Sequence, residues 1–203
     1  MREFLPYLKR ALSFSWPIML NVLLFLLINN YGKIYARNFL SEEDMFNLSF
    51  VQRLAIIIQL AHASAMAYLS KRVYLDKQRG VSLRITALYS ALIVAGVLMV
   101  AAAFVLLRLF SHLTSVPLNA VSLLLVIYTV LWCYVGYLEM YLARINRNKY
   151  VLICSAAAAV VFVAVLFMPF GTPLYRIALA MTLSMAGNLA LVMKLLRHAE
   201  ERT

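Results

Sequence analysis

The sequence predicts an all-α integral membrane protein, a single domain of six transmembrane helices. Hydrophobic residues make up 65% of the 203 residues and charged residues only 13%, whereas about a quarter of the residues in a soluble domain are charged. The mean hydropathy is +0.86. The apolar residues also gather in runs of about 20, the length that a helix needs to cross a bilayer. We therefore expect membrane lipid to cover most of the surface.

Six apolar runs have this length, and each is bounded by charged residues, Pro or Gly. They cover residues 11–31, 46–69, 85–107, 118–142, 150–170 and 174–196. The first run exceeds the apolar stretch of a signal peptide, about 7–15 residues, and predicts a retained span. Because the connections are short, we expect any functional site to lie within the helices or at their ends.

Basic residues predict the orientation of these helices. Of the 19 Lys and Arg, 14 lie on one side: before the first run, in the second and fourth connections, or in the last turn of the sixth run and after it; Arg53 lies within the second run. Only four lie on the other side: Lys33, Arg37, Arg108 and Arg176. Short loops rich in Lys and Arg stay in the cytoplasm. Both ends of the chain are therefore predicted to be cytoplasmic.

The same composition argues against several other classes of protein. The formal net charge of +11 comes from connections rather than from a basic stripe on a solvated face, so no nucleic-acid partner is expected. Cys133 and Cys154 fall in apolar runs without metal-ligand spacing. The sequence contains no phosphate-binding loop and no GxSxG or HExxH motif. We predict no enzymatic activity, no cofactor and no metal.

Polar residues within the first run mark candidate binding residues, because a polar group is costly in hydrocarbon. Pro17 should kink the helix, since it lacks the N–H of a helical hydrogen bond. Asn21, one turn further, could line a cavity or bond to a neighbouring helix. The outer end carries four more candidates, for which a solvated helix end is the alternative: Asn29, Asn30, Lys33 and Arg37.

The second run carries a polar stripe at helical spacing. It comprises Gln52, Gln59, Ala63 and Ser70, with His62 on one flank and Ser49 and Arg53 on the other. Arg53 either lines a water-filled cavity or extends its side chain to the membrane surface. His62 is either a pH-sensitive cavity group or a packing residue. In the fourth run, Glu139 could pair with a loop Arg or couple transport to a proton or ion.

Four segments share the pattern of a known family. They are Asn29-Asn30-Tyr31-Gly32-Lys33-Ile34, Phe39-Leu40-Ser41-Glu42-Glu43-Asp44, the end of the second run at Tyr68-Leu69-Ser70-Lys71, and the basic segment 142–149. Here the chain resembles the O-antigen-type polysaccharide flippases of the multidrug/oligosaccharidyl-lipid/polysaccharide exporter superfamily. The resemblance covers the whole chain, which matches the C-terminal six-helix half of their twelve-helix fold.

The resemblance implies one lobe of an alternating-access transporter in the bacterial cytoplasmic (inner) membrane. Two such lobes are parallel repeats, so a homodimer could rebuild the central cavity; alternatively, an N-terminal half is missing. The substrate would be a polyprenyl-linked saccharide. Its pyrophosphate would be attracted by Arg53, Lys33 and Arg37, and its sugar hydroxyls would bond to Asn21, Gln52, Gln59 and His62.

Other functions stay open beside this one. The chain could be a membrane-embedded small-molecule binding subunit that works with a separate energising partner, in which case an ATPase should copurify. It could also be half of a drug or cation exporter, although acidic residues within the runs are few and leave Glu139 as the candidate. A scaffold role without transport is the fourth possibility.

Overall fold

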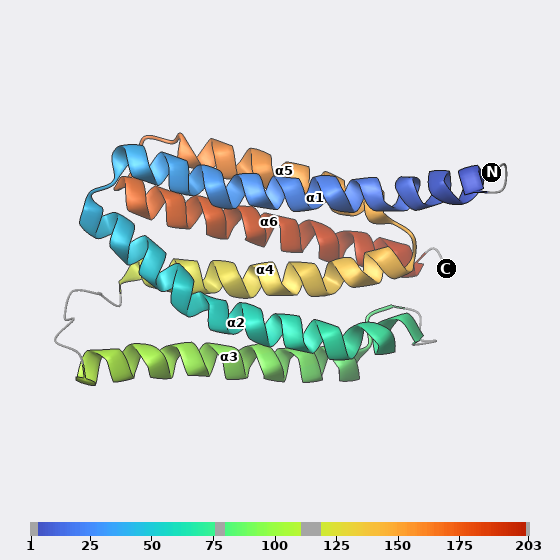
Figure 1. Ribbon diagram of the computed structural model, residues 1–203, viewed down its shortest axis with the longest axis horizontal. Helices are drawn as coiled ribbons and strands as arrows, with labels where there is room; N and C mark the ends of the chain where they lie inside the picture. Colours follow the sequence, from blue (N-terminus) through green and yellow to red (C-terminus); the bar gives the residue numbers. More distant parts are fainter. Residues whose placement is uncertain (1–3, 76–79, 111–118, 202–203) are drawn as a thin grey trace.

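The structure, a computed structural model, describes residues 4–75, 80–110 and 119–201 and contains only helices within them. Figure 1 shows the six helices: α1 (Phe4–Phe39), α2 (Glu42–Leu75), α3 (Leu83–Phe110), α4 (Ala120–Arg144), α5 (Asn148–Leu166) and α6 (Pro173–Glu201). The predicted all-α fold class is confirmed, and each predicted run overlaps one helix. α1 and α2 extend several turns beyond their runs, whereas α5 ends four residues before residue 170. The predicted connection 111–117 lies outside the described residues.

Side-chain caps fix where three of the helices begin. Ser41 Oγ accepts a hydrogen bond from the Asp44 N–H at 3.2 Å, and the first turn of α2 carries three acidic residues that favour the positive end of the helix dipole. Asn119 Oδ1 accepts from the Ser122 N–H at 3.0 Å and caps α4. Thr172 Oγ1 accepts from the Tyr175 N–H at 3.3 Å at the start of α6.

Left-handed residues form the two tight connections. Asn146, at φ 57°, lies between α4 and α5, and Asn is one of the few side chains that tolerate this conformation. Gly171, at φ 61°, lies between α5 and α6, where a Cβ would approach the Tyr175 ring to 3.2 Å. Asn146 follows the end of α4 by two residues, and Gly171 precedes the start of α6 by two, so both lie where the chain reverses.

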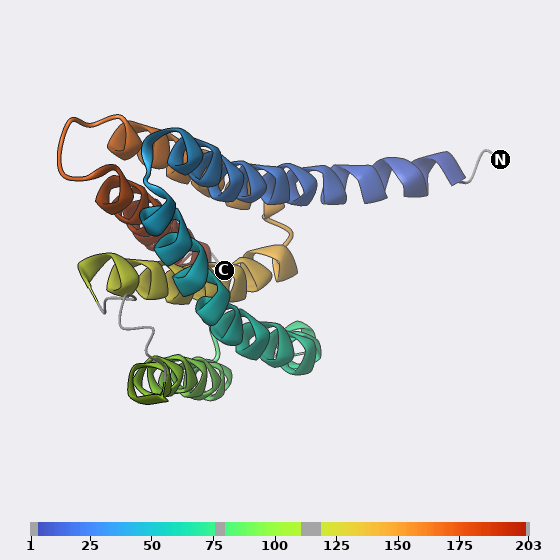
Figure 2. The same cartoon turned by 60° about the vertical axis from the view of Figure 1, so that its left-hand side comes forward.

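α4 and α6 form the centre of the bundle (Figures 1 and 2). α2 packs on α4 and carries α3 on its far side, while α5 packs on α6 and α1 lies against α5. In the most apolar 18-residue stretches of α4 and α6, 44% of the residues are buried, compared with 22% in α2 and α3. The helices therefore follow the spatial order α3, α2, α4, α6, α5, α1.

The outer surface of the bundle is apolar. Leu98, Ile153 and Val160 are 63%, 61% and 70% exposed, and large aliphatic side chains are exposed on every helix. Five helices, α2 to α6, are long and apolar enough to cross a membrane, and α1 contributes the apolar stretch Ala11–Leu26. The chain is a multi-pass membrane protein, because lipid is the solvent that such a surface requires.

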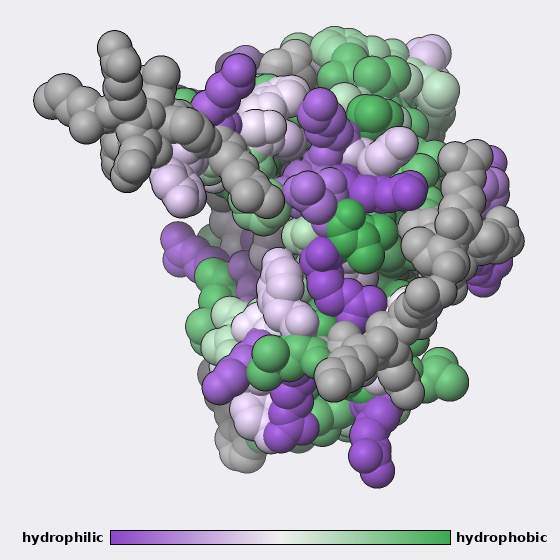
Figure 3. Space-filling model, turned by 90° about the vertical axis from the view of Figure 1, so that its right-hand side faces the viewer, coloured by the Kyte–Doolittle hydropathy of each residue, from purple (hydrophilic) through white to green (hydrophobic). Residues whose placement is uncertain are grey.

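Basic side chains are concentrated at one end of the bundle, which we call the basic end. α1 begins there, α6 ends there, α2 ends and α3 begins there, and the α4–α5 connection lies there (Figure 1). Figure 3 looks onto this end and shows hydrophilic side chains gathered across it. Seven exposed basic residues belong to its helix ends and connections: Lys9, Lys71, Arg72, Arg84, Lys149, Lys194 and Arg197.

Candidate functional site

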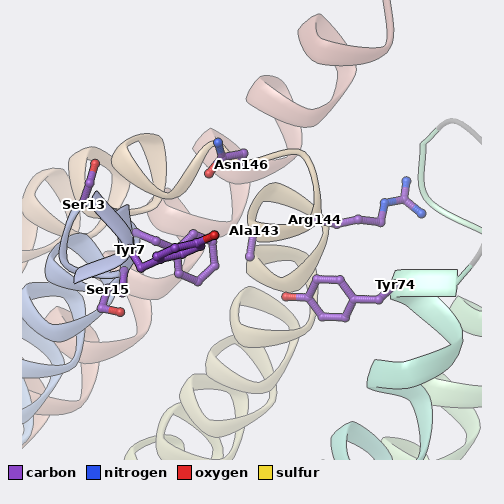
Figure 4. A pocket seen from close by; sticks show the side chains of 9 residues that line it. Tyr7, Ser13, Ser15, Tyr74, Ala143, Arg144 and Asn146 are labelled. Carbon is purple, nitrogen blue, oxygen red and sulfur yellow. The ribbon is translucent and has the colours of Figure 1, made fainter. Parts of the chain in front are cut away.

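A cleft of about 690 Å³ opens at the basic end between α1 and α2, and we call it the α1–α2 cleft. It is lined by Tyr7, Ala11, Ser13, Phe14, Ser15, Tyr74, Ala143, Arg144 and Asn146. Figure 4 shows Tyr7, Ser13 and Ser15 on the α1 side, Tyr74 on the α2 side, and Ala143 between them at the end of α4. The cleft thus combines aromatic rings, hydroxyl groups, an amide and a guanidinium group.

The α1 wall of the cleft is held by α5. Pro17 is buried in α1 and has no N–H to donate to the carbonyl one turn earlier, so the helical hydrogen bonds are interrupted next to the cleft. The buried Asn148, at the start of α5, donates from Nδ2 to the Phe14 carbonyl at 3.3 Å. An amide from a neighbouring helix therefore holds α1 in place where its own backbone hydrogen bonds are interrupted.

Arg144 holds the opposite wall. Its Nη1 donates to the Val73 carbonyl at 3.2 Å and its Nη2 donates to the Gly80 carbonyl at 3.0 Å. The guanidinium also lies 5.2 Å from the centre of the Tyr141 ring. These contacts tie the last turn of α2 and the following connection to α4, because the final carbonyls of a helix lack partners of their own. A positive charge is thereby placed at the wall of the cleft.

A polar pair lies deeper in the bundle than the cleft. Asn21 of α1 donates from Nδ2 to Oε2 of Glu139 in α4 at 3.3 Å. The Oδ1 atom of Asn21 and the Oε1 atom of Glu139 are both buried without a hydrogen-bond partner. Glu139 forms no ion pair with any residue that the structure describes. A carboxylate in this setting needs a proton or a cation to balance its charge.

The other predicted binding residues lie apart from the cleft. Arg53 is exposed on α2, and Gln52 and Gln59 of the same helix are partly buried. At the opposite end of the bundle, Asn30 and Arg37 are exposed. The side chains of Asn29 and Lys33 lie outside the described part of the structure. Of the nine predicted substrate-binding residues, the structure shows a polar partner only for Asn21 and His62 among those it describes.

His62 belongs to a polar aromatic network that joins α2, α3 and α4. Tyr89 of α3 donates its hydroxyl proton to the Cys133 carbonyl at 2.7 Å. A tyrosine has only one such proton, so His62 Nδ1, 2.7 Å away, donates to the Tyr89 oxygen. Gly136 of α4 leaves room for the imidazole, since a Cβ there would lie 3.4 Å from its Cε1 and Nε2 atoms. His62 therefore has a defined hydrogen-bond partner on α3.

The network continues along α4 through tyrosines that the sequence analysis did not single out. Tyr137 stacks on Tyr89 with ring centres 4.2 Å apart, and its hydroxyl lies 2.9 Å from Thr86 Oγ1 and 3.0 Å from the Tyr141 hydroxyl. Tyr134 donates to Ser90 Oγ at 2.7 Å. The spacing of three and four residues between these tyrosines is the signal that could have predicted a shared helix face.

The described residues contain no set of side chains that could bind a metal ion. No group of three or more His, Cys, Asp and Glu side chains in residues 4–75, 80–110 and 119–201 could hold a metal ion. The chemistry of the site in these ranges is that of hydrogen bonds, one guanidinium group and one buried carboxyl group.

Comparison with known proteins gives no match for this chain: no family model, no curated protein and no solved structure matches it.

Proposed function

We propose that this chain is one lobe of a membrane transporter that translocates a lipid-linked saccharide precursor by alternating access. The α1–α2 cleft is the observation that carries this proposal. It opens at the basic end of an otherwise apolar bundle and offers hydroxyl groups from Tyr7, Ser13 and Tyr74 to a sugar. Arg144 supplies a positive charge for a phosphate, although its two hydrogen bonds to carbonyl oxygens also give it a structural role.

The arrangement of the helices supports a two-lobe assembly. Because α1 begins and α6 ends at the basic end (Figure 1), a second lobe can face this one about an axis along the membrane normal without being inverted. In this proposal the second lobe is another copy of the chain or a separate N-terminal half. α1 supplies the sixth span, and the basic end faces the cytoplasm of a bacterium, in keeping with its Lys and Arg content.

Filling the cleft tests the proposal directly. In proteoliposomes, Ala143→Trp should reduce the flipping rate of a fluorescent polyprenyl-pyrophosphate saccharide by about tenfold or more, because the indole would occupy the space between α1 and α2. Ala164→Trp, at an exposed position on α5, serves as the matched control and should leave the rate unchanged. Wild-type flipping by the correctly folded Ala143→Trp protein would reject the cleft as the substrate path.

Arg53 provides a separate test of the predicted pyrophosphate contact. Its side chain is exposed and has no partner among the described residues, so Arg53→Ala should leave folding intact. We expect a decrease of about tenfold in the flipping rate, equivalent to a charge-assisted hydrogen bond of about 1.5 kcal/mol. Arg53→Lys should keep most of the rate. Equal rates for Arg53→Ala and the wild type would exclude this role.

The Asn21–Glu139 pair favours an ion-coupled exporter as the second candidate function. A buried carboxyl group that bridges two helices can bind a proton or a cation in one conformation and release it in the other. One transporter can both translocate a lipid-linked saccharide and use an ion gradient to drive that step. A drug exporter would use the same carboxyl group but would transport its substrate in membranes that contain no polyprenyl lipid.

A further inference from the structure

A second hollow at the basic end lies between the start of α5 and the end of α6, and we call it the α5–α6 hollow. Its volume is about 440 Å³, and it is lined by Arg147, Tyr150, Ile153, Cys154, Leu191, Lys194, Leu195 and His198. A smaller hollow of about 290 Å³ shares Lys194 and His198 with it and adds Arg197. The two hollows together border three basic side chains and a histidine around the last two turns of α6.

The lining of the α5–α6 hollow changes from basic to apolar along the helix axes. On α6, the lining residues follow one helical stripe, at positions 191, 194, 195 and 198. Lys194 and His198 lie towards the end of the helix, whereas Leu191 lies one turn deeper. On α5, Arg147 lies at the helix start and Ile153 lies almost two turns further into the membrane. The hollow is thus cationic at the membrane surface and apolar below it.

Within the described residues, no acidic side chain pairs with the positive charges at this hollow. The Arg147 guanidinium lies 5.6 Å from the centre of the Tyr150 ring, its only partner within the described residues. Lys194 and Arg197 are exposed and form no ion pair there, and the described lining contains no acidic side chain. A ring can hold a guanidinium group in place but does not neutralise it.

We propose that the α5–α6 hollow binds the phosphate headgroup of an anionic membrane phospholipid. Arg147 and Lys194 contact the phosphate, and the acyl chains lie along Ile153 and Leu191. Basic pockets between helices on the cytoplasmic side of a membrane bind anionic headgroups in this manner. The site is formed by α5 and α6, away from the α1–α2 cleft, so this inference does not depend on the proposed transport function.

Native mass spectrometry of the purified protein, titrated in detergent with phosphatidylglycerol or phosphatidylcholine, tests the site. The wild type should retain phosphatidylglycerol in preference to phosphatidylcholine. In the Arg147→Gln/Lys194→Gln variant, the affinity for phosphatidylglycerol should fall about 25-fold, because each charge near the membrane surface contributes about fivefold. The control Arg84→Gln/Lys149→Gln variant removes the same charge from exposed positions at the same end and should keep the wild-type affinity.

Three outcomes would overturn the proposal: equal binding of both lipids, an equal loss in the control variant, or displacement of the lipid by inorganic phosphate alone, which would make the ligand a soluble anion. A photoactivatable phosphatidylglycerol provides a test that needs no variant. On the wild type it should label peptides that contain Ile153 or Leu191, and labelling confined to other helices would contradict the site.

Discussion

Glu139→Gln is expected to reduce coupled transport by about a hundredfold and to leave the fold intact. The glutamine side chain has nearly the same volume, and its carbonyl oxygen can accept the hydrogen bond that Asn21 Nδ2 now donates to Oε2. The amide cannot take up a proton or balance the charge of a cation. A hundredfold loss corresponds to about 2.7 kcal/mol in the free energy of activation. The measurement is flipping in proteoliposomes under an imposed proton or sodium gradient.

The control for this experiment is Glu42→Gln, an exposed acid in the first turn of α2, which should transport at the wild-type rate. The wild type and both variants should melt at the same temperature. If Glu139→Gln transports normally under the same gradient, the Asn21–Glu139 pair is only a structural link between α1 and α4. Gradient-independent flipping by the wild type would contradict the coupling role as well.

Tyr89→Ala is expected to give the largest loss of stability of any single substitution in the polar aromatic network. Tyr89 is fully buried, stacks on Tyr137, and its hydroxyl links His62 to the Cys133 carbonyl. Removing a buried aromatic side chain costs about 3–5 kcal/mol because a cavity remains. Thermal or denaturant unfolding in detergent measures this loss, and Tyr150→Ala, at an exposed position, is the control.

Tyr89→Phe separates the hydroxyl group from the ring. It keeps the ring but leaves the His62 donor without its acceptor. The free energy of unfolding should fall by about 1 kcal/mol, since polar contacts between membrane helices average about 0.6 kcal/mol and reach about 1.7 kcal/mol. His62→Phe combined with Tyr89→Phe should cost less than the sum of the two single substitutions, because the pair is then removed together. Additive losses would show that the 2.7 Å contact contributes no stability.

The fold class was predictable because it depends on composition and run length alone. A segment that crosses hydrocarbon must form all its backbone hydrogen bonds internally, so a run of about 20 apolar residues in a membrane folds as a helix. The helix ends were less predictable. The apolar residues continue to residue 170, but α5 ends at Leu166, because Pro169 lacks the N–H that would continue the helical hydrogen bonds.

The candidate site was predictable in its residues but not in its contacts. Asn21 and Glu139 each stood out as a polar residue in an apolar run, yet their pairing joins positions 118 apart and depends on how α1 crosses the bundle. The lining of the α1–α2 cleft was missed. Tyr74 and Asn146 lie at helix ends and Ser13 at the start of the first apolar run, where polar residues are common and carry no signal until the helices are placed.

The spatial order of the helices has a consequence for biogenesis. α4 and α5 are joined by a connection of three residues, but α6 packs against both and largely separates them. Until α6 leaves the ribosome, the faces of α4 and α5 that it covers stay uncovered in the membrane. The core between α4 and α5 is therefore complete only once α6, the last helix to be synthesised, has packed between them.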